Sequence, residues 1–288
     1  MKRSGRLYLE LCKINVALLA AYAAALGFLL AATALSFAII PTISGVFFLT
    51  CGCLALNQYQ ERDLDALMAR TCGRPLPSGR IRPVQVLYLS GGLLFLGWSA
   101  LSMTGSLLVC ALGLLALIWY NGVYTPLKRK SAFAAVPGAL LGAIPPAMGW
   151  IAGGGSLGDP RLLMLCFFFF LWQVPHTWLL LLHYDRDYAK AGLPSPARIF
   201  SPAQLQRIIF SWLFATTLSG LFLSALGMVH YLFINILLGA LSSWLIWHGF
   251  KPLLHKAEGD GSLCLFKKTN YYLLALLLLL SADRLLYA

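Results

Sequence analysis

The residues best suited to chemistry lie in the stretch NQYQERDLDALMAR, residues 57–70, which directly follows a long apolar run. Asn57, Glu61 and Asp65 are spaced at i, i+4 and i+8. On a helix they share one face and drift by only about 40° per step. Asp63 points to another side of the same helix, and we expect it to pair with a neighbouring arginine.

A second set of polar residues ends another apolar run, in the segments WQVPHTW and YDRDYAKAGLP. If one helix continues through both, Trp172, His176, His183 and Asp187 fall on one stripe. The loops near 59–82 and 184–204 also resemble divergent copies. Each has acids, a Pro and Ser pair, Arg-Ile and then Pro-x-Gln. Repeats around a shared site are common in membrane folds, so we expect the two polar faces to meet.

Clustered carboxylates repel one another unless a cation lies between them. Amide and carboxylate oxygens suit a hard ion such as Mg²⁺, which is usually bound by one or two carboxylates together with substrate phosphates. Basic residues that could grip a phosphate are close in sequence to the acids or to the loops: Arg62, Arg70, Arg74, Arg80, Lys128, Arg129, Lys130 and Arg198. Acids, Mg²⁺ and guanidinium groups together indicate a diphosphate site.

The elements that must position these residues are membrane helices. The chain has 288 residues, of which 59% are hydrophobic and 11% charged, whereas a soluble globule carries about 25% charged residues. Continuous apolar runs exclude the alternating pattern of a barrel strand and predict an all-α polytopic membrane protein, a single domain over 1–288. Nine spans are expected, near 14–32, 36–58, 83–103, 107–125, 132–153, 162–183, 205–227, 231–250 and 270–287.

The net charge of +12 reports membrane topology and gives no indication of a nucleic-acid partner. If the N-terminus is cytoplasmic, all of the 22 Lys and Arg residues except Arg161 and Arg284 fall on the inner side. This asymmetry follows the positive-inside rule and predicts a cytoplasmic N-terminus and an outer C-terminus. No cleavable signal peptide is evident. The seven cysteines contain no CxxC pair and are interpreted as small buried hydrophobes.

The motif NQYQERDLDALMART, followed by RPLPSGRI, resembles the first aspartate-rich motif of the UbiA superfamily of intramembrane prenyltransferases, N-x-x-x-D-x-x-x-D. Three further stretches are similar to the branch of that superfamily that farnesylates protoheme IX. They are YTPLKRKS with GAIPPAMGW, WQVPHTW with YDRDYAKAGLP, and LFKKTNYYLLALLLLLSADRLL. The resemblance implies a nine-helix bundle around a central cavity in a bacterial inner membrane. It also implies transfer of a farnesyl group from farnesyl diphosphate to a vinyl group of protoheme IX, giving heme O.

Carried over by motif, Asn57, Glu61 and Asp65 would hold Mg²⁺ and act in catalysis with Asp187, and Asp185 is an additional candidate ligand. The residues implied for diphosphate binding are Arg62, Arg70, Arg74, Tyr124, Lys128, Arg129 and Arg198. The residues implied for the heme acceptor are Trp172, Gln173, His176 and His183. Heme A synthase and a terminal oxidase are the implied candidates for assembly partners.

The sequence departs from the family pattern at several points. Glu61 replaces the usual Asp, and Gln58 stands where the heme branch often has a second Asn. Arg186 stands where another acid is expected, and SPARIF follows AGLP in place of Met-Leu-Pro.

Two other functions stay open on the sequence alone. The first is a prenyltransferase of the same fold that acts on a phenolic quinone precursor, against which the WQVPH element argues. The second is a transporter with acids lining a pathway. Transporter sites usually lie near the bilayer midplane, whereas these acids are expected at one membrane face.

Overall fold

The computed structural model describes residues 2–34, 36–254 and 261–287, and within them it contains helices and turns and no β-strand. Nine helical segments of this part are long and apolar enough to cross a membrane, which confirms the predicted all-α membrane architecture. The helices are α1 Lys2–Cys12, α2 Ile14–Ala31, α3 Ile39–Leu67, α4 Pro83–Ser102, α5 Leu107–Leu117, α6 Thr125–Leu127, α7 Ala135–Gly138, α8 Leu140–Ala152, α9 Pro160–His183, α10 Asp185–Lys190, α11 Pro202–Leu223, α12 Leu232–Leu254 and α13 Gly261–Tyr287. Short π or 3₁₀ segments lie at Ile118–Tyr124, Ala132–Ala134, Pro196–Arg198 and Ser224–Met228.

Two spans are longer than the apolar runs that predict them. The helix α3 continues to Leu67, well past the expected end near residue 58, and α13 begins at Gly261, well before residue 270. Hydropathy marks only the part of a helix that lies in hydrocarbon, whereas the backbone hydrogen bonds continue into the polar interface. The extension of α3 places Glu61 and Asp65 on the same helix as Asn57, as their spacing predicts.

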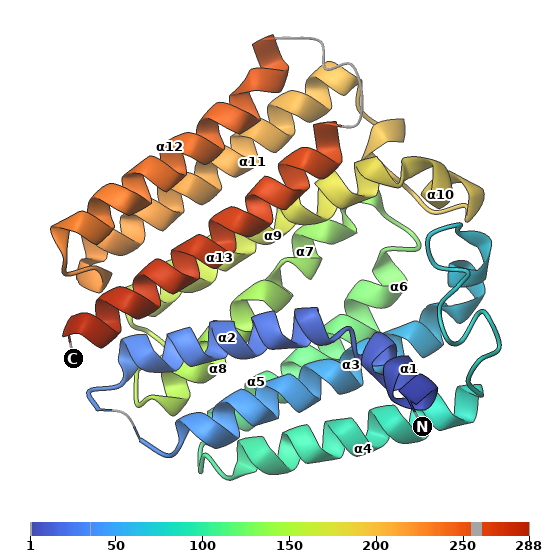
Figure 1. Ribbon diagram of the computed structural model, residues 1–288, viewed down its shortest axis with the longest axis horizontal. Helices are drawn as coiled ribbons and strands as arrows, with labels where there is room; N and C mark the ends of the chain where they lie inside the picture. The colour runs from blue at the N-terminus through green and yellow to red at the C-terminus, as the bar shows by residue number, and fades with distance from the viewer. Residues whose placement is uncertain (1, 35, 255–260, 288) are drawn as a thin grey trace.

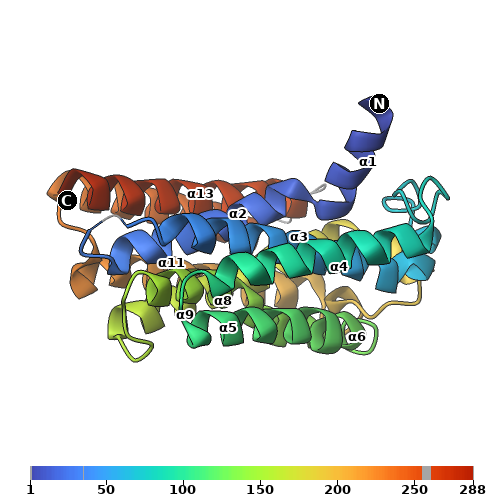
Figure 2. The same ribbon diagram turned by 90° about the horizontal axis from the view of Figure 1, so that it is seen from below.

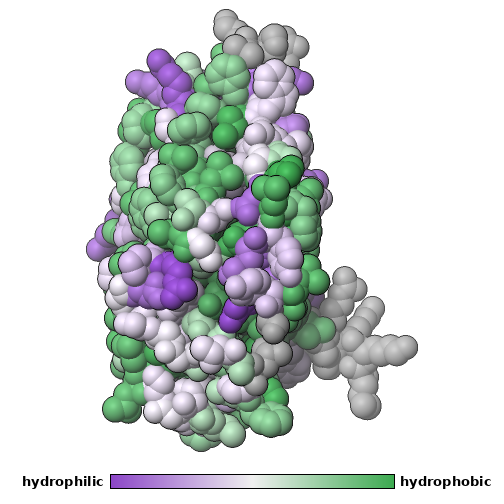
Figure 3. All heavy atoms as spheres, turned by 90° about the vertical axis from the view of Figure 1, so that its left-hand side faces the viewer, coloured by the Kyte–Doolittle hydropathy of each residue, from purple (hydrophilic) through white to green (hydrophobic). Residues whose placement is uncertain are grey.

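The long helices lie side by side, and the chain alternates between the two ends of the bundle (Figure 1). We call one of them the site end; it holds loop 68–82 and α10. The other, called the opposite end, holds the turns 103–106, 153–159 and 229–231 and the end of α13. Figure 2 shows α1 projecting away from the bundle at an angle to α2. Seen from the opposite end, the surface has small hydrophilic patches separated by hydrophobic residues (Figure 3).

Small residues allow α2 and α8 to pack closely. A Cβ atom added to Gly149 would lie 1.8 Å from the carbonyl oxygen of Ala24, and one added to Gly27 would lie 2.1 Å from that of Pro146. No side chain fits at either position, so the two helices touch backbone to backbone. This contact explains Gly149, the second glycine in the stretch GAIPPAMGW.

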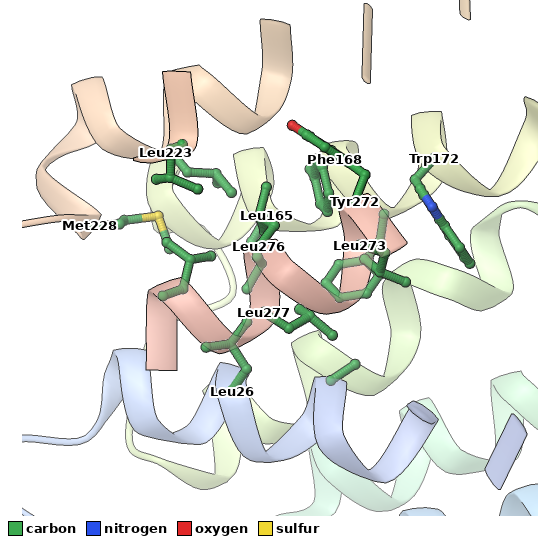
Figure 4. Close-up of a cluster of buried hydrophobic side chains, with 14 of the residues drawn as sticks. Leu26, Leu165, Phe168, Trp172, Leu223, Met228, Tyr272, Leu273, Leu276 and Leu277 are labelled. Atoms are coloured by element: carbon green, nitrogen blue, oxygen red, sulfur yellow. The ribbon is translucent and has the colours of Figure 1, made fainter. Parts of the chain in front are cut away.

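The largest buried cluster lies where α9, α11 and α13 meet α2 (Figure 4). Phe168, Tyr272 and Leu276 are fully buried in it. Trp172 lies at its edge and donates a hydrogen bond from Nε1 to the carbonyl oxygen of Thr269, at 3.0 Å. The cluster therefore fixes the position of Trp172, one of the aromatic residues expected to meet the acceptor.

Candidate functional site

The polar face of α3 is buried at the site end. Asn57, Glu61 and Asp65 are 1%, 6% and 2% exposed, although amide and carboxylate groups are seldom buried without partners. Asp63 points outward and lies 3.7 Å from the Nε atom of Arg62, as expected from the helical spacing. The structure therefore separates the acids of this stretch into a buried set and a surface residue.

Each buried residue on this face has a partner from a different part of the chain. Asn57 donates from Nδ2 to Oγ1 of Thr125, at 2.9 Å, which leaves its carbonyl oxygen as the group that could bind a cation. Glu61 forms an ion pair with Lys128. Asp65 accepts a hydrogen bond from Arg74, with 2.7 Å between Oδ2 and Nη1. Two carboxylates thus face two long cationic side chains that can exchange partners.

The second polar segment reaches the same region through α10. The backbone N–H of Arg70 donates to Oδ2 of Asp187 at 3.1 Å, and the Arg70 guanidinium lies 4.6 Å from the ring centre of Tyr184. Loop 68–82 is therefore tied to α10, which brings the two expected halves of the site together. Oδ1 of Asp185 is buried and has no hydrogen-bond partner among the described residues.

The expected stripe of Trp172, His176, His183 and Asp187 along one helix is wrong. The helix α9 ends at His183, and Tyr184, with φ −103° and ψ 21°, separates it from α10. Because the helical repeat is broken there, Asp187 lies on a separate short helix. Its proximity to the first site comes from the contact with Arg70.

The remaining basic residues differ in their surroundings. Arg62 packs over the ring of Tyr59 and donates to the carbonyl oxygen of that residue, away from the buried acids. Arg129 donates to the carbonyl oxygen of Gln60 on α3, and Arg198 is exposed in the 3₁₀ segment Pro196–Arg198. Of the arginines expected at a diphosphate, Arg70 and Arg74 are the two that the structure places directly against the acids.

A cavity of about 340 Å³ lies inside the bundle. Its wall is largely apolar, and Cys53 and Leu54 of α3 contribute to it one turn before Asn57. Polar atoms and rings on the wall come from Tyr120, Tyr124, Gln173 and Thr177. An apolar chamber that opens beside buried acids suits an amphipathic ligand with an anionic head.

The residues expected at the acceptor divide into two groups. Trp172 and Gln173 line the cavity, whereas His176 is not among its lining residues. The ring of His176 packs between Trp172 and Phe266, with centroid distances of 4.5 and 4.7 Å, and its side chain is hydrogen-bonded to Asn270. His183 contacts the ring of Tyr184 at 4.4 Å, at the end of α9. His176 therefore supports a cavity residue from behind.

The oxygen atoms of Asn57, Glu61 and Asp65 suit a divalent cation, although both carboxylates are paired with basic side chains in this structure. No group of three or more His, Cys, Asp or Glu residues is close enough to hold a metal in the described part of the chain. However, Glu61 and Asp65 are buried carboxylates whose partners are cations, and the oxygen of Asn57 lies on the same face. The buried, unpaired Oδ1 of Asp185 adds a further oxygen without a partner among the described residues.

Sequence reasoning gave no role to three residues here. Thr125, next to Tyr124 in the YTPLKR motif, positions Asn57, and only its place in that motif could have suggested it. Gln58 donates to the carbonyl oxygens of Glu10 and Leu11 at 3.1 and 2.9 Å. Lys13 lines the cavity. Burial lowers the pKa of Lys13 to about 7; Arg74 also lowers it, whereas Asp65 raises it.

Comparison with known proteins shows the family of this chain. The model of the UbiA prenyltransferase family matches residues 16–260. A protein of Geobacter sulfurreducens named protoheme IX farnesyltransferase is 41% identical over 224 residues, which cover 77% of this chain and 82% of that protein. One of the same name from Nitratidesulfovibrio vulgaris, strain Hildenborough, is 36% identical over 79% of each chain.

Solved structures share the fold at low sequence identity. A digeranylgeranylglyceryl phosphate synthase superposes with a TM-score of 0.78 at 15% identity and covers 99% of both chains. A UbiA homolog from Archaeoglobus fulgidus bound to GPP and Mg²⁺ superposes with a TM-score of 0.62 at 17% identity, over 96% of this chain and 99% of that one. With the family model matching most of its length, the chain belongs to the UbiA prenyltransferase family.

Proposed function

We propose that this protein transfers a farnesyl group from farnesyl diphosphate to a vinyl group of protoheme IX, giving heme O and diphosphate. The observation that carries the proposal is the similarity, at 36–41% identity over at least three quarters of each chain, to proteins named protoheme IX farnesyltransferase. The apolar cavity beside buried acids and arginines supports it, because both substrates combine a large apolar body with anionic groups.

We propose Asn57, Glu61, Asp65 and Asp187 as the residues that hold Mg²⁺, with Asp185 as a further ligand. The fold neighbour bound to GPP and Mg²⁺ supports a divalent metal in this fold. Bound there, Mg²⁺ supplies positive charge that stabilises diphosphate as it leaves. The carboxylates would release Lys128 and Arg74 when the metal binds, which frees both cations for phosphate oxygens.

The chain's own groups account for the other requirements of an electrophilic alkylation. Arg70, Arg74, Lys128 and Arg129 would hold the leaving group by charge, with Tyr124 beside Lys128. Arg62 and Arg198 face outward in this structure, so their part would be to attract the diphosphate from solution. The apolar wall keeps water from the allylic cation that forms when the carbon–oxygen bond breaks. The vinyl group attacks that cation, and water then adds its oxygen and loses a proton to give the hydroxyethylfarnesyl group.

For the acceptor, we propose that Trp172 and Gln173 contact the porphyrin from the cavity wall. His176 would act through Trp172, against which its ring packs at 4.5 Å. His183, at the end of α9, would lie at the rim. Aromatic faces on the wall can also stabilise the allylic cation, by about 0.5–2 kcal/mol each.

We further propose that the chain is a single domain in a bacterial inner membrane, with a cytoplasmic N-terminus and an outer C-terminus. The site end would then face the cytoplasm, because it carries all the described basic residues except Arg161 and Arg284. Single cysteines placed at Lys190 and Gly155 should be labelled from opposite sides of the membrane. Labelling of both from one side contradicts this orientation.

The experiment that tests the function is mass analysis of heme extracted from membranes that contain or lack the protein. We expect heme O only where the protein is present and Mg²⁺ is supplied. The matched control is the Asp65→Asn variant, which should insert equally well and form heme O about 100-fold more slowly or not at all. Prenylation of a phenolic acceptor without change to the heme would contradict the proposal and favour the quinone-precursor reaction.

A further inference from the structure

Lys13 differs from every other non-glycine residue that the structure describes. It is the only one with a positive φ, at 43° with ψ 58°, a left-handed conformation that disfavours residues with a Cβ atom. The surrounding sequence LELCKINVA contains no Gly or Pro that would call for a break. The strain therefore has a cause outside the local sequence.

The cause is a pair of hydrogen bonds from α3, the helix that carries Asn57, Glu61 and Asp65. Gln58 lies on α3 and its side chain is buried, with 1% exposed. It donates hydrogen bonds to the carbonyl oxygens of Glu10 and Leu11, two of the last three residues of α1. Because these carbonyl oxygens accept from a side chain, they do not need the backbone N–H groups of a continuing helix, and α1 can end here. Leu11 is fully buried beside Ala55 and Ile81, so the end of α1 is also fixed by packing. Lys13 is thereby held at the junction of α1 and α2.

Held in this way, Lys13 is the only charged residue among those described that line the cavity. Its side chain forms no ion pair in the described part of the chain, whereas Lys128 pairs with Glu61 and Arg74 with Asp65. It is close enough to Arg70, Arg74 and Lys128 to experience their positive charge, and Asp65 is the one carboxylate that acts on it in the opposite sense. A lysine that has no ion-pair partner among the described residues, on an apolar wall beside three cations and one carboxylate, suits an anion that pairs with its ammonium form.

We propose that Lys13 is a further substrate-binding residue, which holds the anionic end of a molecule in the cavity and is positioned for this by Gln58. The inference rests on the proposed function, which offers two sources of the anion: the diphosphate of the prenyl donor and the carboxylates of the porphyrin. Both present oxygen atoms to an ammonium group in the same way.

The test uses the purified full-length protein and two ligands measured apart. Magnesium diphosphate binding is followed by calorimetry, and binding of protoheme IX and of its dimethyl ester by absorbance. The variant Lys13→Asn removes the charge but suits a left-handed backbone, and Lys13→Gly also removes the strain. Both should unfold at a temperature no lower than the wild type. Lys251→Met, an exposed lysine on α12, is the control for loss of one positive charge.

If diphosphate is the anion, Lys13→Asn and Lys13→Gly lower the affinity for magnesium diphosphate by about tenfold or more. Their affinity for protoheme IX stays unchanged. If a porphyrin carboxylate is the anion, the two variants lower the affinity for protoheme IX by that factor. The wild type then binds protoheme IX more tightly than its dimethyl ester, whereas the variants bind both equally. Lys13→Arg keeps the positive charge and should therefore keep the wild-type affinity in either case. Gln58→Met should weaken the same ligand by a smaller factor, and combining it with Lys13→Asn should add no further loss.

Affinities of Lys13→Asn within twofold of those of Lys251→Met for both ligands would overturn the inference. That outcome is distinct from failure of the proposed function, in which the wild type itself would bind neither magnesium diphosphate nor protoheme IX.

Discussion

Buried carboxylates occur at both ends of the bundle, and the two ends treat them differently. At the opposite end Asp283 is fully buried, and it accepts hydrogen bonds from the backbone N–H groups of His230 and Tyr231 at 2.9–3.0 Å. Its Oδ2 also lies 2.8 Å from Nδ1 of His230. At the site end Glu61 and Asp65 are paired with Lys128 and Arg74.

The difference lies in what the partners can do. Backbone N–H groups are fixed by the fold, so the carboxylate of Asp283 joins the start of α12 to α13 and has nothing left to offer a ligand. The side chains of Lys128 and Arg74 are 24% and 18% exposed and can turn toward a phosphate. The exchangeable side-chain partners of Glu61 and Asp65 therefore indicate functional carboxylates, whereas the set of fixed donors around Asp283 indicates a structural one.

The sharpest test of this contrast removes one charge at the site end. Glu61→Gln and Asp65→Asn should each lower turnover by about 100-fold or more, because fixed charge at the leaving group is lost. Stability should change little, since the released cations are close to solvent. Glu61→Asp restores the residue usual in the family and should retain activity. Full turnover of Glu61→Gln at limiting Mg²⁺ would show that this carboxylate is no ligand.

The opposite result is expected for Asp283→Asn. An amide cannot accept from three donors as a carboxylate does, so we expect a loss of about 2–3 kcal/mol in the free energy of unfolding. The thermal midpoint in detergent should fall, while turnover per folded molecule stays at the wild-type value. A variant of normal stability with impaired turnover would break the comparison between the two ends.

Sequence reasoning could reach the helices and the acids for physical reasons. A span of lipid-facing helix must be apolar over about 20 residues, and this leaves nine runs that hydropathy detects. The spacing of Asn57, Glu61 and Asp65 follows from the helical repeat, and it holds because α3 continues unbroken to Leu67. Local periodicity was sufficient wherever the helix itself was regular.

It failed where the backbone departs from the repeat. The break at Tyr184 moves Asp187 off the stripe of His176, and the break at Lys13 depends on Gln58, which lies 45 residues further along the chain. The position of His176 behind Trp172 depends on Phe266 and Asn270 of α13. Such contacts join distant segments and leave no periodic signal in one sequence.

Two histidines that pack against aromatic rings extend the comparison to aromatic residues. At the opposite end His230 stacks on Tyr287, with 3.6 Å between ring centres, far from the cavity. His176 packs at a tilt, with an interplanar angle of 32°, against Trp172, which lines the cavity. We expect Trp172→Leu to weaken protoheme IX by about tenfold through loss of a large aromatic contact. His176→Phe keeps a ring behind Trp172 and should cost about threefold or less, as measured by absorbance titration. A loss with His176→Phe that equals that of Trp172→Leu would mean that the imidazole itself contacts the heme.

The smallest effect is expected at an ion pair of the opposite end that is partly open to solvent. Asp159 caps α9 by accepting from the backbone N–H of Arg161 at 2.9 Å, and its Oδ2 lies 2.7 Å from Nη2 of the same residue. The hydrogen bond from the Arg161 side chain lowers the pKa of Asp159 below its usual value of 3.8. A carboxyl whose pKa is lower in the folded state stabilises the fold above the unfolded pKa, and this contribution is lost as the pH falls through the folded pKa.

We therefore expect Asp159→Asn to lower the free energy of unfolding by less than about 1 kcal/mol at pH 7. The difference from the wild type should shrink as the pH drops below 3.8. Thermal midpoints of both proteins between neutral pH and pH 3 would measure this. Activity at pH 7 should not change, and a loss of turnover would mean that the opposite end is coupled to the site.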